Sequence, residues 1–183
     1  THVTDVANVL LWENLKDVIL VGHSYGGMVA TGVADRLADR IADIVYLDAI
    51  VPSDGQSTLD VQPPGRAAWM IERAREAGGV AGEPVDAEVY GVFEPGARAW
   101  VNGKCTPHPF AALSQKLRIS GKPAERIAKR LYILCTDPPL PYMRQFYDAA
   151  LAAPGWDTLE LPTGHDAMVT MPDRLTEILA SRA

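Results

Sequence analysis

The stretch VILVGHSYGG, residues 18–27, decides the fold that this sequence predicts. Its first four residues are apolar and mostly β-branched, which favours a buried strand. The residues after it, from Val29 to Leu37, are apolar at helical spacing. Ser24 therefore lies where a buried strand turns sharply into a helix, and the G-x-S-x-G pattern around it is typical of a nucleophile elbow.

An elbow of this kind makes demands on the backbone around Ser24. A side chain at the tip of so tight a turn needs a strained backbone and small neighbours, which Gly22 and Gly26 provide because glycine has no Cβ. The turn also aims the backbone N–H of Tyr25 at the reacting carbon, so we expect it to contribute to an oxyanion hole. The alternative is a glycine-rich turn in which the serine is incidental.

The rest of the chain alternates strand and helix patterns. Buried strands are predicted at 44–47, 131–135 and 157–161, which with 18–21 makes about four. Because helices or long crossovers separate them, the fold class is α/β, with a mostly parallel sheet and helices on both faces.

One segment interrupts this alternation. Residues 52–125 are rich in proline and glycine and hold one clear helix at about 66–77, and they are too long for an ordinary connection. We expect core segments at 1–51 and 126–183, with 52–125 as a cap insertion over the carboxyl edge of the sheet.

Composition bounds the function further. The 183 residues suffice for one domain with a core, and the net charge of −6 argues against nucleic acid and anionic membranes as partners. No apolar run is long enough to span a membrane. Two cysteines, Cys105 and Cys135, make no disulfide framework, so the cytoplasm is the simplest predicted compartment. No cluster has metal-ligand spacing, and the oligomeric state is left open.

Three side chains at or just after the ends of predicted strands suggest nucleophilic catalysis by a serine. A serine hydroxyl needs a base within hydrogen-bond reach, and the base needs an orienting acid. Ser24, Asp137 and His165 occur in the order nucleophile, acid, base, at the carboxyl ends of predicted parallel strands. Asp48 also ends a strand and is the main rival for the acid. Asp166, adjacent to the histidine, is a better candidate for capping the loop.

Four motifs carry a resemblance to a known family. They are VGHSYGGM at 21–28, VYLDA at 45–49, LYILCTD at 131–137 and GHDAM at 164–168. The chain resembles the α/β-hydrolase superfamily, and more narrowly bacterial relatives of the plant methylesterase, salicylate-binding and hydroxynitrile lyase group. The resemblance implies Ser24 as nucleophile, His165 as base and Asp137 as acid, with no cofactor.

The sequence departs from that family in two places. Family members begin with further strands and a His-Gly turn that supplies the second oxyanion donor, so we expect this chain to be the C-terminal part of a longer protein. Hydroxynitrile lyases of the group carry a lysine after the catalytic histidine, where this sequence has Asp166. That difference favours ester hydrolysis.

The predicted function is therefore that of a serine carboxylesterase acting on a small-molecule ester. The alternatives are a ligand-binding protein of the same fold with little or no turnover, a chain inactive by itself, and a hydroxynitrile lyase. In the insertion, Trp69, Phe93, Trp100 and His108 are predicted to line the substrate pocket, together with Met70, Tyr90 and Phe110. Such residues also commonly form a small core of their own.

Overall fold

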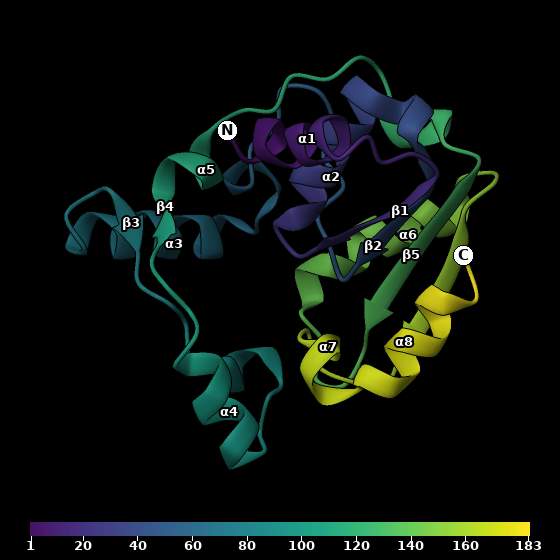
Figure 1. Ribbon diagram of the computed structural model, residues 1–183. Helices are drawn as coiled ribbons and strands as arrows, with labels where there is room; N and C mark the ends of the chain where they lie inside the picture. The colour runs from purple at the N-terminus through teal and green to yellow at the C-terminus, as the bar shows by residue number, and fades with distance from the viewer.

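The computed structural model describes residues 1–183 and is built on a four-stranded parallel sheet (Figure 1). The strands lie in the order β1 (Val18–His23), β2 (Ile41–Leu47), β5 (Lys129–Cys135) and β6 (Asp157–Leu161). This confirms the predicted α/β class and the four strands. Strands β2 and β5 each begin two or three residues earlier than their apolar runs indicate, because polar residues at their starts still join the ladder.

Helices cover both faces of the sheet, as predicted. On one face lie α1 (His2–Trp12), α2 (Gly26–Leu37) and α6 (Arg144–Ala152), and on the other lie α7 (Ala167–Thr170) and α8 (Pro172–Ala180). The side chains of β2 alternate between them: Ile44 and Tyr46 join the larger apolar cluster, and Val45 and Leu47 join the smaller one. The alternation is what two covered faces require of a parallel strand.

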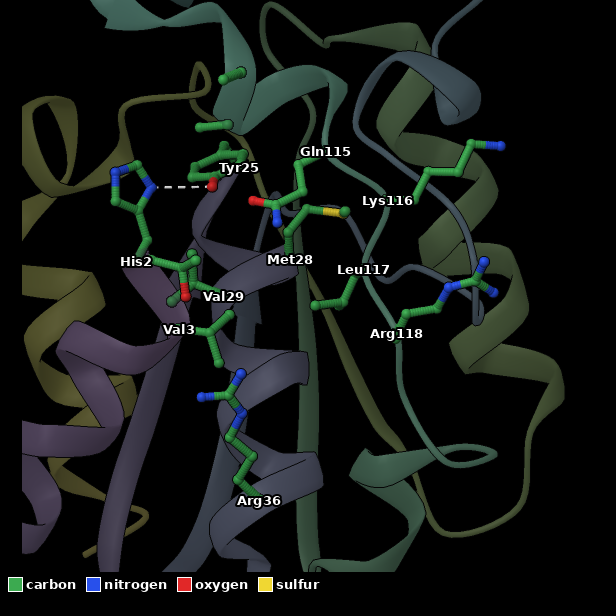
Figure 2. Close-up of a pocket in the computed structure, with 13 residues that line it drawn as sticks. His2, Val3, Tyr25, Met28, Val29, Arg36, Gln115, Lys116, Leu117 and Arg118 are labelled. Carbon is green, nitrogen blue, oxygen red and sulfur yellow. Dashed lines mark hydrogen bonds between the residues drawn. The ribbon is translucent and has the colours of Figure 1, made fainter.

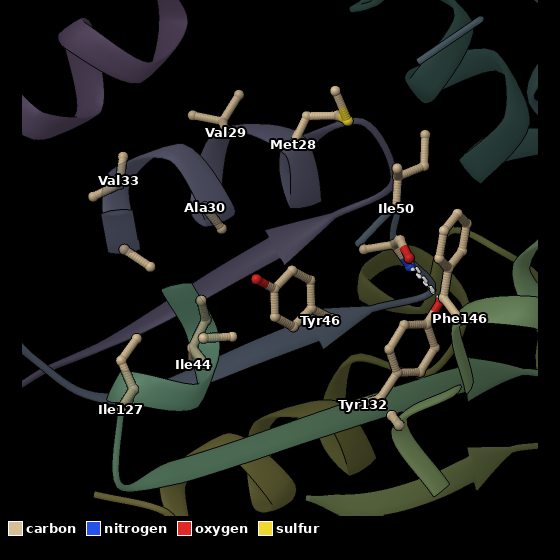
Figure 3. Close-up of a cluster of buried hydrophobic side chains, with 14 of the residues drawn as sticks. Met28, Val29, Ala30, Val33, Ile44, Tyr46, Ile50, Ile127, Tyr132 and Phe146 are labelled. Carbon is tan, nitrogen blue, oxygen red and sulfur yellow. Dashed lines mark hydrogen bonds between the residues drawn. The ribbon is translucent and has the colours of Figure 1, made fainter. Parts of the chain in front are cut away.

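Two buried tyrosines give the larger core a polar framework (Figure 3). The hydroxyl of Tyr46 lies 2.8 Å from that of Thr31 on α2. The hydroxyl of Tyr132 donates to the carbonyl of Ala49 at 2.7 Å and accepts from the Ala49 N–H at 3.1 Å. Burial raises the pKa of both tyrosines, so they stay protonated donors. Tyr132 thereby fixes the turn that follows β2.

Residues 52–125 contribute no strand to the main sheet. They form a lobe beside it, which Figure 1 shows in blue-green and teal, with a two-stranded antiparallel sheet of their own. Its elements are α3 (Pro64–Glu76), β3 (Ala81–Gly82), α4 (Pro95–Asn102), β4 (His108–Pro109) and α5 (Phe110–Ser114), with short 3₁₀ turns at Leu59–Val61 and Ala87–Tyr90. Three more 3₁₀ turns, Ala38–Arg40, Pro123–Arg126 and Pro141–Met143, pack against the larger core of the sheet. No helix in the protein is both long and apolar enough to traverse a bilayer.

Candidate active site

The elbow between β1 and α2 holds Ser24 in a left-handed backbone conformation, with φ at +54°. A non-glycine residue in that region is strained and persists only where its surroundings hold it. Here the Ser24 N–H donates to the Leu47 carbonyl at 3.3 Å, and the Ser24 carbonyl accepts from the Ile50 N–H at 3.1 Å. The end of β2 and the turn after it therefore keep the serine at the tip of its turn.

Gly22 and Gly27 allow neighbouring backbone to pack closely against the elbow, whereas the sequence predicts this role for Gly22 and Gly26. A Cβ on Gly22 would lie 2.8 Å from the Gly26 carbonyl oxygen and 2.9 Å from the Ala30 Cβ. A Cβ on Gly26 would meet nothing within 4 Å, so the prediction of crowding at that position is wrong. The crowded partner is Gly27, because the Ile50 carbonyl runs directly against it.

A buried pair stands next to the elbow. The Nδ1 atom of His165, in the loop after β6, lies 2.6 Å from the Oδ2 atom of Asp48, which directly follows β2. The Asp48 side chain is fully buried, and its other oxygen accepts the Cys135 N–H at 3.1 Å. A carboxylate on Nδ1 holds the imidazole in one orientation and leaves Nε2 as the nitrogen that can exchange a proton with a substrate or nucleophile.

The contact predicted for Asp137 is not present in the structure. Asp137 follows β5 and is exposed, and no hydrogen bond or ion pair joins its carboxylate to His165. Its backbone N–H instead donates to the Thr163 carbonyl at 3.0 Å, which ties it to the start of the His165 loop. Strand order does not explain the choice, because β5, which precedes Asp137, is the strand next to β6. The loop after β6 instead places Nδ1 of His165 on the buried Asp48, and the Asp137 side chain stays exposed.

The oxyanion donor that the elbow predicts has no partner in the chain. The backbone N–H of Tyr25 makes no hydrogen bond to any protein group, although it lies at the start of a buried helix. A donor left open at the N-terminus of a helix is available for a developing negative charge. The Ser24 hydroxyl likewise makes no hydrogen bond to His165 or to any other side chain, as is common before a substrate binds.

His23, next to the serine, serves the histidine loop rather than a substrate. Its Nε2–H donates to the His165 carbonyl at 3.0 Å, and the two rings lie 4.4 Å apart between centroids. Burial, and then repulsion from His165, lower the pKa of His23 to about 3. His23 therefore stays neutral when His165 takes up a proton.

His23, His165 and Asp166 are also the one group of potential metal ligands, with candidate atoms within 4.8 Å of one another. Their imidazole nitrogens are largely engaged already, because Nε2 of His23 donates to a carbonyl and Nδ1 of His165 faces Asp48. Burial raises the pKa of Asp166, which weakens it as an anionic ligand at low pH. The group is better described as a hydrogen-bonded support for the His165 loop.

A cavity of about 290 Å³ opens at the elbow, between the sheet and the lobe of residues 52–125. Ser24 and Tyr25 line it from the sheet side. Aromatic and charged side chains of the insertion and of the segment after β5 line much of the rest, among them Arg66, Trp69, Arg73, Tyr90, His108 and Tyr142. Its size and mixed lining fit a small organic molecule.

Of the predicted pocket residues, Trp69 and His108 line this cavity, together with Met70 and Tyr90. Phe93 and Trp100 do not, contrary to prediction, and both are about 60% exposed. Trp100 lies on the outside because α4 packs the neighbouring Val101 into a small buried cluster with Ala87 and Val92. Phe110 is absent from the lining as well.

Tyr25 separates this cavity from a second one of about 320 Å³, drawn in Figure 2. The Tyr25 hydroxyl lies 3.0 Å from Nδ1 of His2 on α1, the contact dashed in that view. Ser24 does not line the second cavity. Tyr25 therefore forms a wall of the serine cavity whose position is set by the first helix.

A serine at an elbow, a buried Asp–His pair and an open helix N-terminus on a parallel sheet define a hydrolase-type site. The chain belongs to the alpha/beta hydrolase family, whose model matches residues 1–178.

Relatives narrow the resemblance. The chain is 42% identical to a carbendazim hydrolyzing esterase of Nocardioides sp. over 99% of its own length and 77% of that protein. It is 30% identical, over 67% of its length and 31% of the relative, to the Arabidopsis thaliana protein named "Putative methylesterase 13, chloroplastic". An extracellular α/β-hydrolase from a Paenibacillus species, described as similar in structure and function to tobacco salicylic acid binding protein 2, superposes with a TM-score of 0.85 at 25% identity, covering 100% of this chain and 80% of that one. The predicted likeness to the plant methylesterase and salicylate-binding group is confirmed.

Proposed function

We propose that this protein is a serine carboxylesterase in which Ser24, His165 and Asp48 form the catalytic triad. Membership of the family and the 42% identity to an esterase support a carboxylesterase-type hydrolase. The observation that carries the residue assignment is the 2.6 Å contact between His165 and the buried Asp48, beside a serine held at φ +54°. Asp48 takes the place that the sequence assigned to Asp137.

The reaction divides into two steps that use the same groups. Nε2 of His165 accepts the Ser24 proton as the hydroxyl oxygen attacks the ester carbonyl, and the Tyr25 N–H stabilises the resulting oxyanion. The tetrahedral intermediate collapses, and His165 gives its proton to the departing alcohol. Water, deprotonated by the same histidine, then releases the acid from Ser24 and restores the hydroxyl.

The environment of His165 suits it to accept and return a proton in these two steps. The Asp48 carboxylate faces the side of the ring away from the proposed reaction and stabilises the imidazolium. His23, although 4.4 Å away between ring centroids, carries no charge that would oppose it. Asp48 and the neutral His23 therefore both suit His165 to hold the proton that it takes from Ser24.

The test is hydrolysis of p-nitrophenyl acetate, a methyl ester and carbendazim by the wild type and Ser24→Ala. Loss of the nucleophile is expected to lower kcat by about 10⁴-fold or more. Trapping with an irreversible phosphonate, followed by peptide mass mapping, should place the label on Ser24. Equal rates in the two proteins would refute the serine mechanism.

Three further expectations belong to this proposal. The cytoplasm remains the predicted compartment, since both cysteines are unpaired. The net charge of −6 argues against nucleic acid and anionic membranes as partners. Residues 52–125 act as a cap in this proposal, because they supply most of the wall that faces Ser24.

A further inference from the structure

The serine cavity holds an unusual concentration of unpaired polar atoms. Four buried side-chain atoms in the protein have no hydrogen-bond partner: Thr58 Oγ1, Gln62 Oε1, Arg66 Nε and His108 Nε2. All four residues line the cavity that Ser24 lines. Thr58 and Gln62 are themselves more than nine-tenths buried. Buried polar atoms without partners are costly, and their collection at one cavity indicates that a ligand supplies the partners.

The chemistry of these atoms restricts that ligand. The Nε–H of Arg66 is only a donor, so it needs an acceptor. The Oε1 atom of Gln62 is only an acceptor, so it needs an N–H or O–H donor. Thr58 and His108 can serve either role. A carboxylate alone would satisfy Arg66 but leave Gln62 unpaired.

The walls add a requirement of shape. The guanidinium of Arg66 lies 4.5 Å from the ring centre of Tyr142 and 5.7 Å from that of Trp69. Tyr90 lines the same cavity, and its ring centre lies 5.3 Å from that of His165. Aromatic walls beside a small cavity favour a flat ring, which can stack on them while its edge makes hydrogen bonds.

We propose that Gln62 and Arg66, with Thr58 and His108, form a polar subsite that selects esters whose non-reacting part is a flat ring with both an N–H donor and a nitrogen or oxygen acceptor. This inference rests on the proposed function for the cleavage step. It goes beyond it by naming the substrate class and the residues that set specificity. Plain aryl and alkyl esters are poor substrates by comparison, because they leave all four atoms without partners.

The kinetic test compares two esters of the same shape. Methyl 1H-benzimidazole-2-carboxylate carries the donor and the acceptor, and methyl 1H-indene-2-carboxylate replaces both with carbon. Each kcat/KM is divided by the hydroxide-catalysed rate constant of the same ester, which removes intrinsic reactivity. The wild type is expected to prefer the benzimidazole about 100-fold or more. Arg66→Met and Gln62→Leu should each reduce this ratio by about 10-fold or more.

A control variant comes from the same helix. Arg75 on α3 is exposed and does not line the cavity, so Arg75→Met should leave the ratio unchanged. A ratio near 1 in the wild type, or a ratio that Arg66→Met and Gln62→Leu leave intact, would overturn the proposal.

A binding measurement separates this proposal from the esterase assignment. Calorimetry on Ser24→Ala, with the cavity otherwise native, compares the two corresponding carboxamides, which are not cleaved. We expect the benzimidazole carboxamide to bind about 10-fold tighter or more. If no ester is hydrolysed but this preference is found, the subsite stands and the esterase proposal fails. If Ser24-dependent hydrolysis is found but the two carboxamides bind equally, the reverse holds.

Discussion

Replacing Asp48 with asparagine separates the two candidate acids. The side chain is fully buried, lies 2.6 Å from Nδ1 of His165, and also accepts the Cys135 N–H. Asparagine keeps the shape, tolerates the positive φ of 41° at this position, and can still accept from Cys135. It removes the negative charge and offers an N–H to Nδ1, which favours the wrong tautomer of the histidine.

The expected loss follows from the charge and the tautomer. Unit charges about 4 Å apart at an effective dielectric constant of about 20 attract by about 4 kcal/mol, which corresponds to about 10³-fold in rate. The wrong tautomer adds to this, and an amide in place of a triad acid costs about 10⁴-fold in kcat. Asp137→Asn, an exposed change, should alter kcat by no more than about threefold.

The assay is Ser24-dependent release of p-nitrophenol, measured for wild type, Asp48→Asn and Asp137→Asn at one pH. Thermal melting of each variant shows that lost activity is not lost fold. If Asp137→Asn abolishes turnover while Asp48→Asn retains it, the assignment of the acid from the 2.6 Å contact is refuted.

Three further outcomes can be measured on stability and specificity. Because folding lowers the pKa of His23 to about 3, the unfolded chain takes up a proton that the folded chain refuses as the pH falls below about 6.5. Urea unfolding should therefore show about 2 kcal/mol less stability at pH 5 than at pH 7 from this group, a loss absent in His23→Gln; identical pH dependence in both proteins would contradict it. Gly22→Ala should destabilise the fold by about 1–3 kcal/mol because its Cβ would lie 2.8 Å from a backbone carbonyl, while Gly65→Ala on α3, where nothing lies within 4 Å, should be neutral or stabilising in the same melts. Trp69→Ala should lower kcat/KM for an aryl ester about 10-fold through lost contact area, and Trp100→Ala, which does not line the cavity, should match the wild type; equal effects would place the substrate elsewhere.

The elbow was predictable because all its determinants are local. An apolar run, a glycine-flanked serine and a helical pattern lie within twenty residues, and the structure forms β1 (Val18–His23), Ser24 and α2 (Gly26–Leu37) accordingly. The strands and the two-faced sheet follow for the same reason, since each depends on a short apolar run. The role of Gly27 was missed, because its neighbour Ile50 approaches from another segment.

The acid was not predictable from position alone. Asp48 and Asp137 both follow buried strands, and strand ends say only that each carboxylate lies at the same edge of the sheet. Which of them meets His165 depends on how the loop after β6 folds back, because it reaches Asp48 past β5, the strand next to β6. Gln62 and Arg66 gave no signal either, because no short motif marks a side chain that is left unpaired only in the folded protein.

The lobe of residues 52–125 is packed directly against the loop that carries His165, so the sequence of neither can change independently. A Cβ on Gly164, just before His165, would lie 2.7 Å from the Cα of Gly91 and from the Tyr90 carbonyl oxygen. That close approach lets the Asp166 N–H donate to the Tyr90 carbonyl at 3.4 Å. Since Tyr90 also lines the serine cavity, the wall that contacts a substrate is attached to the loop that carries the base. A change of specificity in the insertion is therefore tolerated only if it leaves this Gly91–Gly164 contact in place.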